Sequence, residues 1–291
     1  MKQIIWKSIL FITLSVMPIF AKAQLFAGKS GLTLADTLRG SITPERAWWD
    51  ALHYDLAVKF DIDGKKISGT NRITFQVLKE DSIMQIDLME PMQITKITMD
   101  GIAVSFARNG AVHYLHIPKK MEVGAVETLE IDFNGSPRIA KNAPWDGGIV
   151  YKTDINGKPF VSVACQGLGA SVWYPNKDHQ ADEPDSVRMR ITIPGDLVAV
   201  SNGTFEARVK NPDNTVTYIW KVVNPINNYN FVPYIGDYAR YEEVYQGEKG
   251  PLHVEMWFLK HNMEEAKKHV LPEIRRTIEA FEFWFGPFPF Y

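Results

Sequence analysis

The sequence has a single cysteine, Cys165, among its 291 residues. One cysteine excludes an intramolecular disulfide and a cysteine-rich zinc module, so we expect packing alone to stabilise the fold. The sequence also lacks a basic block, because its 32 Lys and Arg residues and 34 Asp and Glu residues are spread along the chain and give a net charge of −2. Nucleic-acid binding needs a concentrated positive face, so nucleic acid is not an expected partner.

Motifs for catalysis are missing or incomplete. A helical zinc site of the H-E-x-x-H kind needs a Glu directly after a His, and none of the seven histidines has one. The segment around Ser171, Gly-Ala-Ser-Val-Trp, lacks the final glycine of a nucleophile elbow. A lone cysteine after an apolar strand is typical of a small buried hydrophobe. We therefore expect this chain to contribute no catalytic residue and no metal ligand, and to bind no cofactor itself.

The first 23 residues have the pattern of a secretory signal peptide. Lys2 and Lys7 precede a mostly apolar run over residues 9–20, and Ala21-Lys22-Ala23 forms a small-x-small cleavage site. Twelve residues rise about 18 Å as a helix, which is short of a bilayer core of roughly 30 Å. We therefore predict cleavage, export to a periplasm or the extracellular space, and no remaining membrane span. Without these three lysines the rest of the chain carries a net charge of −5.

What is abundant is apolar sequence, at 45% of residues, enough for one large domain or two smaller ones. From about residue 52 to 245 the apolar positions alternate with polar ones, which indicates strands with one buried face. Asp63-Gly64, Asp100-Gly101 and Asn109-Gly110 lie between such runs and predict tight turns. Many short strands separated by turns predict an antiparallel sandwich or saddle. The strand positions are Tyr54, Leu56, Val58, Phe60, Ile62, Ile67, Ile73, Phe75, Val77, Met84, Ile86, Leu88, Leu129, Ile131, Phe133, Val187, Met189, Ile191 and Ile193.

The pattern changes after Gly250-Pro251. One further strand is expected over residues 252–259, followed by a helix with Asn262 as its N-cap. An apolar stripe of Ala266, Val270, Ile274, Ile278, Phe281 and Phe285 recurs at helical spacing. Pro272 should kink or split this helix. The stripe and the aromatic residues after it have no evident packing partner, so we interpret them as the start of a second domain that this chain does not contain.

The most informative stretch runs from Phe160 to Pro184. An apolar strand ends at Cys165, and Gln166 follows, with small residues, an aromatic pair and an acidic loop after it. Gln166 can donate and accept hydrogen bonds beside glycines that allow close approach, which is typical of a recognition edge. A tight loop whose glycines serve only the turn is the alternative, and the residues alone favour it. Asp182, Glu183 and Asp185 lack calcium-ligand spacing and are expected to form a solvated acidic turn.

This stretch resembles the zinc aminopeptidases of the aminopeptidase N and leukotriene hydrolase family. In that family a Gln or Glu at a strand end is followed nine residues later by a Pro and then by an Asp-Glu-Pro-like turn, as at Gln166, Pro175 and residues 182–184. Three further motifs occur in the same order as in the family: Tyr-Asp-Leu at 54–56, Val-Ser-Asn-Gly at 200–203 and Trp-Phe-Gly-Pro-Phe-Pro at 284–289. The similarity covers about residues 47–291. Two positions depart from the family pattern: Ser171 replaces an Arg, and the loop after Pro175 is four residues longer.

The resemblance implies a mainly β fold, with a saddle-like β-sandwich followed by the first strand and helix of an α+β thermolysin-like domain. The expected divisions are a signal peptide at 1–23, a leader at 24–46, the sandwich at 47–248 and the start of the catalytic domain at 249–291. In the family, the residue matching Gln166 holds the substrate's free amino end or first side chain. Gln166 is therefore the one predicted substrate-binding residue.

The implied activity is removal of N-terminal residues from peptides, with zinc as the cofactor of the full-length enzyme. The family's zinc motif is not in this chain, so we expect the chain alone to be inactive and to need the missing catalytic domain as its partner. A standalone β-sandwich that binds peptides or another protein is the alternative. The sequence does not indicate residue preference, physiological substrate or oligomeric state.

Overall fold

The computed structural model describes residues 33–290, so the expected signal peptide and the first part of the leader lie outside the described residues. The chain divides into two units, Met1–Thr37 and Leu38–Tyr291. In the first unit, Thr33 Oγ1 accepts a hydrogen bond from Asp36 N at 3.2 Å, and Thr33 N donates to Asp36 Oδ2 at 2.9 Å. This reciprocal cap opens helix α2 (Leu34–Gly40), and a short helix α3 (Pro44–Ala47) follows in the second unit.

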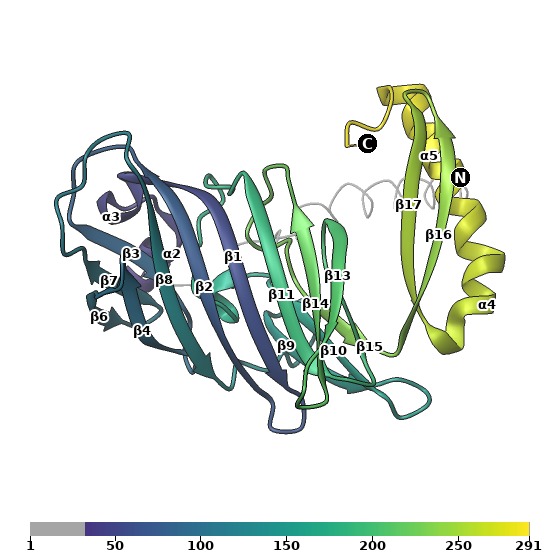
Figure 1. The fold of residues 1–291 in the computed structure, drawn as a ribbon, viewed down its shortest axis with the longest axis horizontal. Coiled ribbons are helices and arrows are strands. Elements are labelled where there is room, and N and C mark those ends of the chain that lie inside the picture. Colours follow the sequence, from purple (N-terminus) through teal and green to yellow (C-terminus); the bar gives the residue numbers. More distant parts are fainter. Residues whose placement is uncertain (1–32, 291) are drawn as a thin grey trace, which may run out of the picture. The chain divides into compact units, whose positions relative to one another are not determined.

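The largest sheet of the second unit has eight strands in the order β13-β14-β11-β1-β2-β8-β4-β5 (Figure 1). Neighbouring strands are antiparallel except β1 and β11, which run parallel with His53 opposite Ser186. The predicted antiparallel character is therefore confirmed with one exception. The strands are β1 (Trp49–Asp61), β2 (Lys66–Val77), β4 (Gln93–Met99), β5 (Ile102–Ala103), β8 (Val126–Gly135), β11 (Ser186–Pro194), β13 (Thr204–Lys210) and β14 (Thr215–Val222).

Two smaller sheets complete the core of this unit. The order of one is β12-β15-β10-β9, and the order of the other is β3-β7-β6. Their neighbouring strands are all antiparallel. The strands are β3 (Ile83–Asp87), β6 (Ser105–Asn109), β7 (Val112–His116), β9 (Gly148–Thr153), β10 (Pro159–Ala164), β12 (Val198–Val200) and β15 (Tyr234–Gly236).

The alternation of apolar and polar residues along the strands explains which side chains form the hydrophobic core. The strand positions predicted from the period of two are buried in one continuous hydrophobic cluster, with the exception of Ile62. Ile62 follows the end of β1 and is only partly buried against that cluster. In β1 the alternation changes phase at a register shift between Ala51 and His53, which keeps Trp49 and Tyr54 both on the buried face. The burial pattern of these strands is therefore readable from sequence.

The Asp-Gly and Asn-Gly pairs form turns as predicted. Asp100 and Gly101 join β4 to β5 with φ angles of 53° and 77°, and Gly110 lies between β6 and β7 with φ of 61°. These left-handed conformations suit Gly and Asp and match the twist of the flanking strands.

A two-stranded sheet and a broken helix form the C-terminal part. Strand β16 (Tyr238–Gly247) pairs with β17 (Gly250–Leu259), as expected for the strand after Gly250. A 3₁₀ turn, η3 (Lys260–Asn262), helix α4 (Met263–Glu265), a π-helical turn, η4 (Ala266–Val270), and helix α5 (Leu271–Phe285) follow. Asn262 makes no side-chain cap, so that prediction is wrong, because the 3₁₀ turn already places Asn262 in a helical conformation. The π turn ends just before Pro272, which agrees with the predicted interruption.

The apolar stripe of α5 is largely solvent-exposed in the described structure. Phe281 and Phe285 are 60% and 82% exposed, while Glu282 between them is buried. The Glu282 carboxylate accepts hydrogen bonds from Tyr245 Oη at 2.9 Å and Glu248 N at 3.0 Å, which anchors α5 to the β16–β17 turn. A polar contact thus holds this helix end, and its aromatic side chains remain uncovered.

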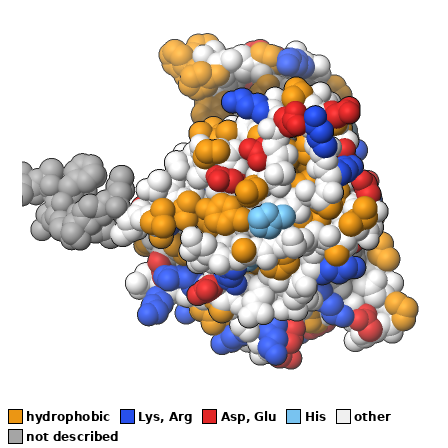
Figure 2. All heavy atoms as spheres, turned by 90° about the vertical axis from the view of Figure 1, so that its left-hand side faces the viewer, with side chains coloured by type: hydrophobic (Ala, Val, Ile, Leu, Met, Phe, Trp, Pro, Cys, Tyr) orange, Lys and Arg blue, Asp and Glu red, His pale blue; other side chains and the backbone are white. Residues whose placement is uncertain are grey.

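Charged side chains of both signs are interspersed on the face that carries β4, β6 and β7 (Figure 2). Ion pairs such as Lys119 with Asp100 at 2.6 Å contribute to this mixture. Among residues 33–290, no helix is long and apolar enough to cross a membrane.

Candidate functional site

Gln166 lies directly after β10, in a turn on the wall of a cleft of about 1250 Å³. Its side chain is exposed to solvent, whereas the strand before it is buried at Val161 and Val163 and partly buried elsewhere. The structure thus places the one sequence-predicted site residue at a concave surface, as recognition of a small ligand requires. The cleft is lined by Arg39, Gly40, Ala143, Pro144, Val150, Ser162, Val163, Ala164, Cys165, Gln166, Gly167, Leu168, Gly169, Asp178, His179, Gln180, Ala181, Asn227, Tyr229 and Tyr234.

The turn that carries Gln166 is closed by its own backbone. The N–H groups of Leu168 and Gly169 both donate to Cys165 O, at 3.0 and 2.8 Å. Gly167 and Gly169 have φ angles of +70° and +85°, which glycine adopts at little cost. The two glycines therefore serve the turn geometry, and that geometry leaves the Gln166 side chain exposed at the cleft.

Asp178 fixes the downstream end of this turn. Its carboxylate accepts hydrogen bonds from Ser171 N at 2.9 Å and from Ala170 N at 3.3 Å. A Cβ added at Gly169 would collide with the same carboxylate. Only a glycine therefore lets the chain pass this close to Asp178.

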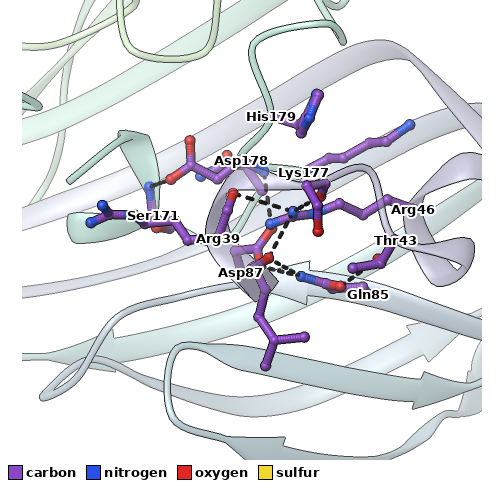
Figure 3. A network of polar contacts seen from close by, with 12 residues as sticks. Arg39, Thr43, Arg46, Gln85, Asp87, Ser171, Lys177, Asp178 and His179 are labelled. Atoms are coloured by element: carbon purple, nitrogen blue, oxygen red, sulfur yellow. Dashed lines mark hydrogen bonds and ion pairs between the residues drawn. The ribbon is translucent and has the colours of Figure 1, made fainter. Parts of the chain in front are cut away.

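A buried polar network supports Asp178 from below (Figure 3). Asp87 on β3 accepts hydrogen bonds from Asp178 N at 3.1 Å and from Arg46 Nη2 at 2.7 Å. Gln85 donates to Asp87 at 2.9 Å and accepts from Thr43 Oγ1 at 2.7 Å. These hydrogen bonds join three separate segments of the chain at one point. The segments are α3 with the residue before it, strand β3, and the loop after Gln166.

Arg46 also ties the leader to this network. Its Nη1 donates to Leu38 O at 2.9 Å, Ser41 O at 2.7 Å and Arg39 O at 3.4 Å, so the guanidinium fixes the backbone before α3. Arg39 in turn donates from Nη1 to Gly167 O at 3.0 Å. Arg39 and Gly40 are therefore part of the cleft wall, which the sequence did not indicate.

The acidic loop contains a second buried ion pair. Lys177 contacts Asp182, and both side chains are less than 5% exposed. Lys177 Nζ also donates to Trp49 O and lies 4.4 Å from the centroid of the Trp49 ring. The expectation of a solvated acidic turn is therefore wrong for Asp182, whose charge is compensated by a lysine, while Glu183 and Asp185 are exposed as expected.

An aromatic cluster holds the same loop against the large sheet. The rings of Tyr174 and Phe231 are 5.3 Å apart, and those of Tyr54 and Phe231 are 6.0 Å apart. Asn71 on β2 donates to Pro175 O at 2.9 Å. Ser171, which replaces the family's Arg, is buried with its N–H bound to Asp178. The loop after Gln166 is thus rigidly packed on its core side and open on its cleft side.

The pKa values of Cys165 and His179, which line the cleft, are both shifted so as to favour the neutral form. Burial raises the pKa of the Cys165 thiol to about 12, and Asp178 contributes in the same direction, so this thiol is a poor nucleophile. Burial lowers the pKa of His179, with smaller contributions from the charges of Arg46 and Lys177. His179 is therefore neutral at pH 7.

The histidines do not assemble into a metal centre in the described part of the chain. Within residues 33–290, no three His, Cys, Asp or Glu side chains lie close enough together to hold a metal ion. On β7, His113 is buried and His116 exposed, which confirms that a spacing of three on a strand separates them. The described residues thus offer no cluster of ligands that fits zinc.

Sequence reasoning predicted Gln166 but did not indicate Arg39 or Asp178, which line the same cleft. Asp178 belongs to an acidic stretch that has no local signal for backbone capping. Arg39 reaches Gly167 across 128 positions of sequence. Only tertiary structure could bring these residues together.

Comparison with known proteins identifies the fold. Solved structures of the M1 zinc metallopeptidase from Deinococcus radiodurans superpose with TM-scores of 0.67 for a mutant bound to a Tyr-Ser-Ala substrate, 0.68 for a mutant and 0.65 for another structure. Sequence identity is 18%, 17% and 17%, with 84%, 86% and 84% of this chain covered. The chain spans 55–57% of those proteins. No curated protein sequence matches significantly.

The sequence profile of the Peptidase M1 N-terminal domain matches residues 50–229, from the start of β1 to the loop after β14. This range includes Gln166, Asp178 and Tyr174. The resemblance to zinc aminopeptidases and the mainly β fold are thereby confirmed. This chain belongs to the Peptidase M1 N-terminal domain family.

Proposed function

We propose that this chain is the substrate-side domain of an exported zinc aminopeptidase and that Gln166 binds the amino end or first side chain of a peptide. The observation that carries the proposal is the exposed Gln166 amide in a preformed turn on the wall of a 1250 Å³ cleft. An amide offers both a donor and an acceptor, and the rigid loop behind it reduces the entropy lost on binding.

Zinc and the hydrolytic groups would come from a catalytic domain that pairs with this one. The lack of a metal cluster among residues 33–290 and the uncovered aromatic side chains of α5 both support this division of labour. We assign residues 47–248 to the sandwich and 249–291 to the start of the catalytic domain. Export rests on the signal-peptide pattern of residues 1–23, and N-terminal sequencing of the secreted protein should begin at Gln24.

Peptide titration of the purified chain tests the role of Gln166. We expect Tyr-Ser-Ala to bind, and Gln166→Ala to weaken binding about threefold to tenfold, the value of one or two lost hydrogen bonds. Gln93→Ala is the matched control, because Gln93 is exposed on β4 and does not line the cleft. Equal affinity of the native chain and Gln166→Ala would contradict the proposal.

The alternative is a standalone module that binds peptides or proteins through the same edge and the α5 aromatic side chains. The two functions differ in their demand for a free amino end. An N-acetylated Tyr-Ser-Ala should bind more weakly to a substrate-side domain, whereas unchanged affinity favours the module. Incubation with aminoacyl amides and added zinc should release no product in either case, and turnover with bound zinc would overturn both.

A further inference from the structure

A positive charge lies on the cleft wall beside Gln166. Arg39 lines the cleft, and its Nη1 donates to the carbonyl of Gly167, the residue after Gln166. Arg39 lies in the leader, outside residues 50–229 that match the family profile. The profile match therefore does not include this charge.

The position of Arg39 is set by buried contacts. Its carbonyl oxygen and those of Leu38 and Ser41 accept hydrogen bonds from Arg46, whose guanidinium is fully buried on Asp87. The same Asp87 accepts from Asp178 N, on the other side of the Gln166 turn. A shared anchor thus holds Arg39 and the turn together, and little ordering of this backbone is needed when a ligand binds.

The Asp178 carboxylate also lines the cleft, but it forms no ion pair with Arg39. Both oxygens of Asp178 are engaged by the N–H groups of Ala170 and Ser171. His179 is neutral at pH 7. Within residues 33–290, no carboxylate lies within 4 Å of the Arg39 guanidinium, which uses one N–H group on Gly167 and has others for a ligand.

We infer that the cleft contains an anion subsite in which Arg39 binds a carboxylate of the peptide. The carboxylate would come from an acidic side chain or from the C-terminus of a short peptide, since both present the same planar group to a guanidinium. This inference rests on the proposed function, because it assigns a preference to the peptide site around Gln166. It makes Arg39 a specificity-determining residue.

Three peptides separate the two sources of the carboxylate. Glu-Ser-Ala amide has a side-chain carboxylate, Gln-Ser-Ala with a free C-terminus has a terminal carboxylate, and Gln-Ser-Ala amide has neither. We expect at least one carboxylate peptide to bind the native chain about threefold tighter than the neutral amide, as for a solvent-accessible ion pair. The preference should shrink in 0.5 M NaCl because salt screens exposed charges.

Variants assign this preference to Arg39. Arg39→Gln should abolish it, Arg39→Lys should retain part of it, and Arg276→Gln should leave it unchanged, because Arg276 is exposed on α5 outside the cleft. Equal binding of all three peptides to the native chain would overturn the inference. Equal weakening of all three by Arg39→Gln would also overturn it, since Arg39 would then only hold the turn.

A failure of the proposed function can be distinguished from a failure of the anion subsite. Gln166→Ala should weaken all three peptides to a similar extent without changing their order. If Gln166→Ala has no effect and the Arg39-dependent preference persists, the assignment of Gln166 is wrong while the anion subsite stands.

Discussion

The Arg46 guanidinium and the Asp87 carboxylate form a 2.7 Å ion pair in which the two side chains are 0% and 5% exposed. The pair joins the leader to β3, and through Asp178 it reaches the turn that carries Gln166. A buried ion pair connected in this way links the stability of the core to the geometry of the cleft.

Removal of Asp87 should be severely destabilising. Asp87→Ala would leave the Arg46 charge buried without its partner, and we expect a loss of about 3–5 kcal/mol in the free energy of unfolding. Glu130→Ala is the control, because Glu130 pairs with Arg72 at the surface and should cost under about 1 kcal/mol. Urea unfolding followed by circular dichroism measures both, and similar small losses would refute the role given to the network.

Lys177 and Asp182 should be energetically coupled. Lys177→Met and Asp182→Leu would each leave one buried charge without its partner, whereas the double variant removes both charges. We therefore expect the double variant to lose less stability than the sum of the two single losses, by about 1 kcal/mol or more. Additive losses in a double-mutant cycle would show that the two side chains do not act as a pair.

Gly169 and Gly167 provide a matched test of the turn. Both have positive φ, so an alanine at either position should cost about 1 kcal/mol of backbone strain. Only at Gly169 would the new Cβ meet the Asp178 carboxylate, while at Gly167 nothing lies within 4 Å. We expect Gly169→Ala to lose more stability and more peptide affinity than Gly167→Ala, and equal effects would argue against close packing on Asp178.

Acid should destabilise the fold partly through His113. Burial, helped by the charge of Arg108, lowers the pKa of His113 to about 4 from about 6.5 in the unfolded chain. Between these values the unfolded chain binds a proton that the folded chain excludes, so the contribution is present above pH 6.5 and is lost as the pH falls toward 4. His113→Gln should therefore show a shallower fall of unfolding free energy over this range than the native chain.

The exposed residue of the same strand is the control for this pH effect. His116→Gln changes an exposed side chain on β7 and should leave the slope unaltered. If the unfolding free energy of His113→Gln falls with pH as steeply as that of the native chain, other groups account for the acid sensitivity.

The strand pattern was predictable because burial of one sheet face imposes a period of two on the sequence. Tyr54, Leu56 and Val58 carry that period within one segment, and Asp100-Gly101 signals its turn locally. The parallel pairing of β1 with β11 was not predictable, because it joins segments separated by more than a hundred residues and has no local signal.

The candidate site was predictable only in part, because contacts between segments distant in sequence leave no local signal. Gln166 follows a recognisable strand end, but the residues alone favour a plain turn there, and only the family resemblance points to a binding role. Asp182 belongs to an acidic loop, and nothing in that loop reveals that Trp49 and Lys177 will enclose it. Arg39 is held at the cleft by contacts between distant segments, namely its own hydrogen bond to Gly167 O and the Arg46–Asp87 ion pair beneath it.

The most direct test of the account is the NMR response of the Gln166 side-chain amide when Tyr-Ser-Ala is added to the purified chain. We predict saturable shifts of the Gln166 NH₂ signals and of the backbone signals of residues 165–169, with the Gln93 NH₂ signals unmoved. Shifts that cluster elsewhere, or no saturable shift at Gln166, would contradict the claim that this turn binds peptide.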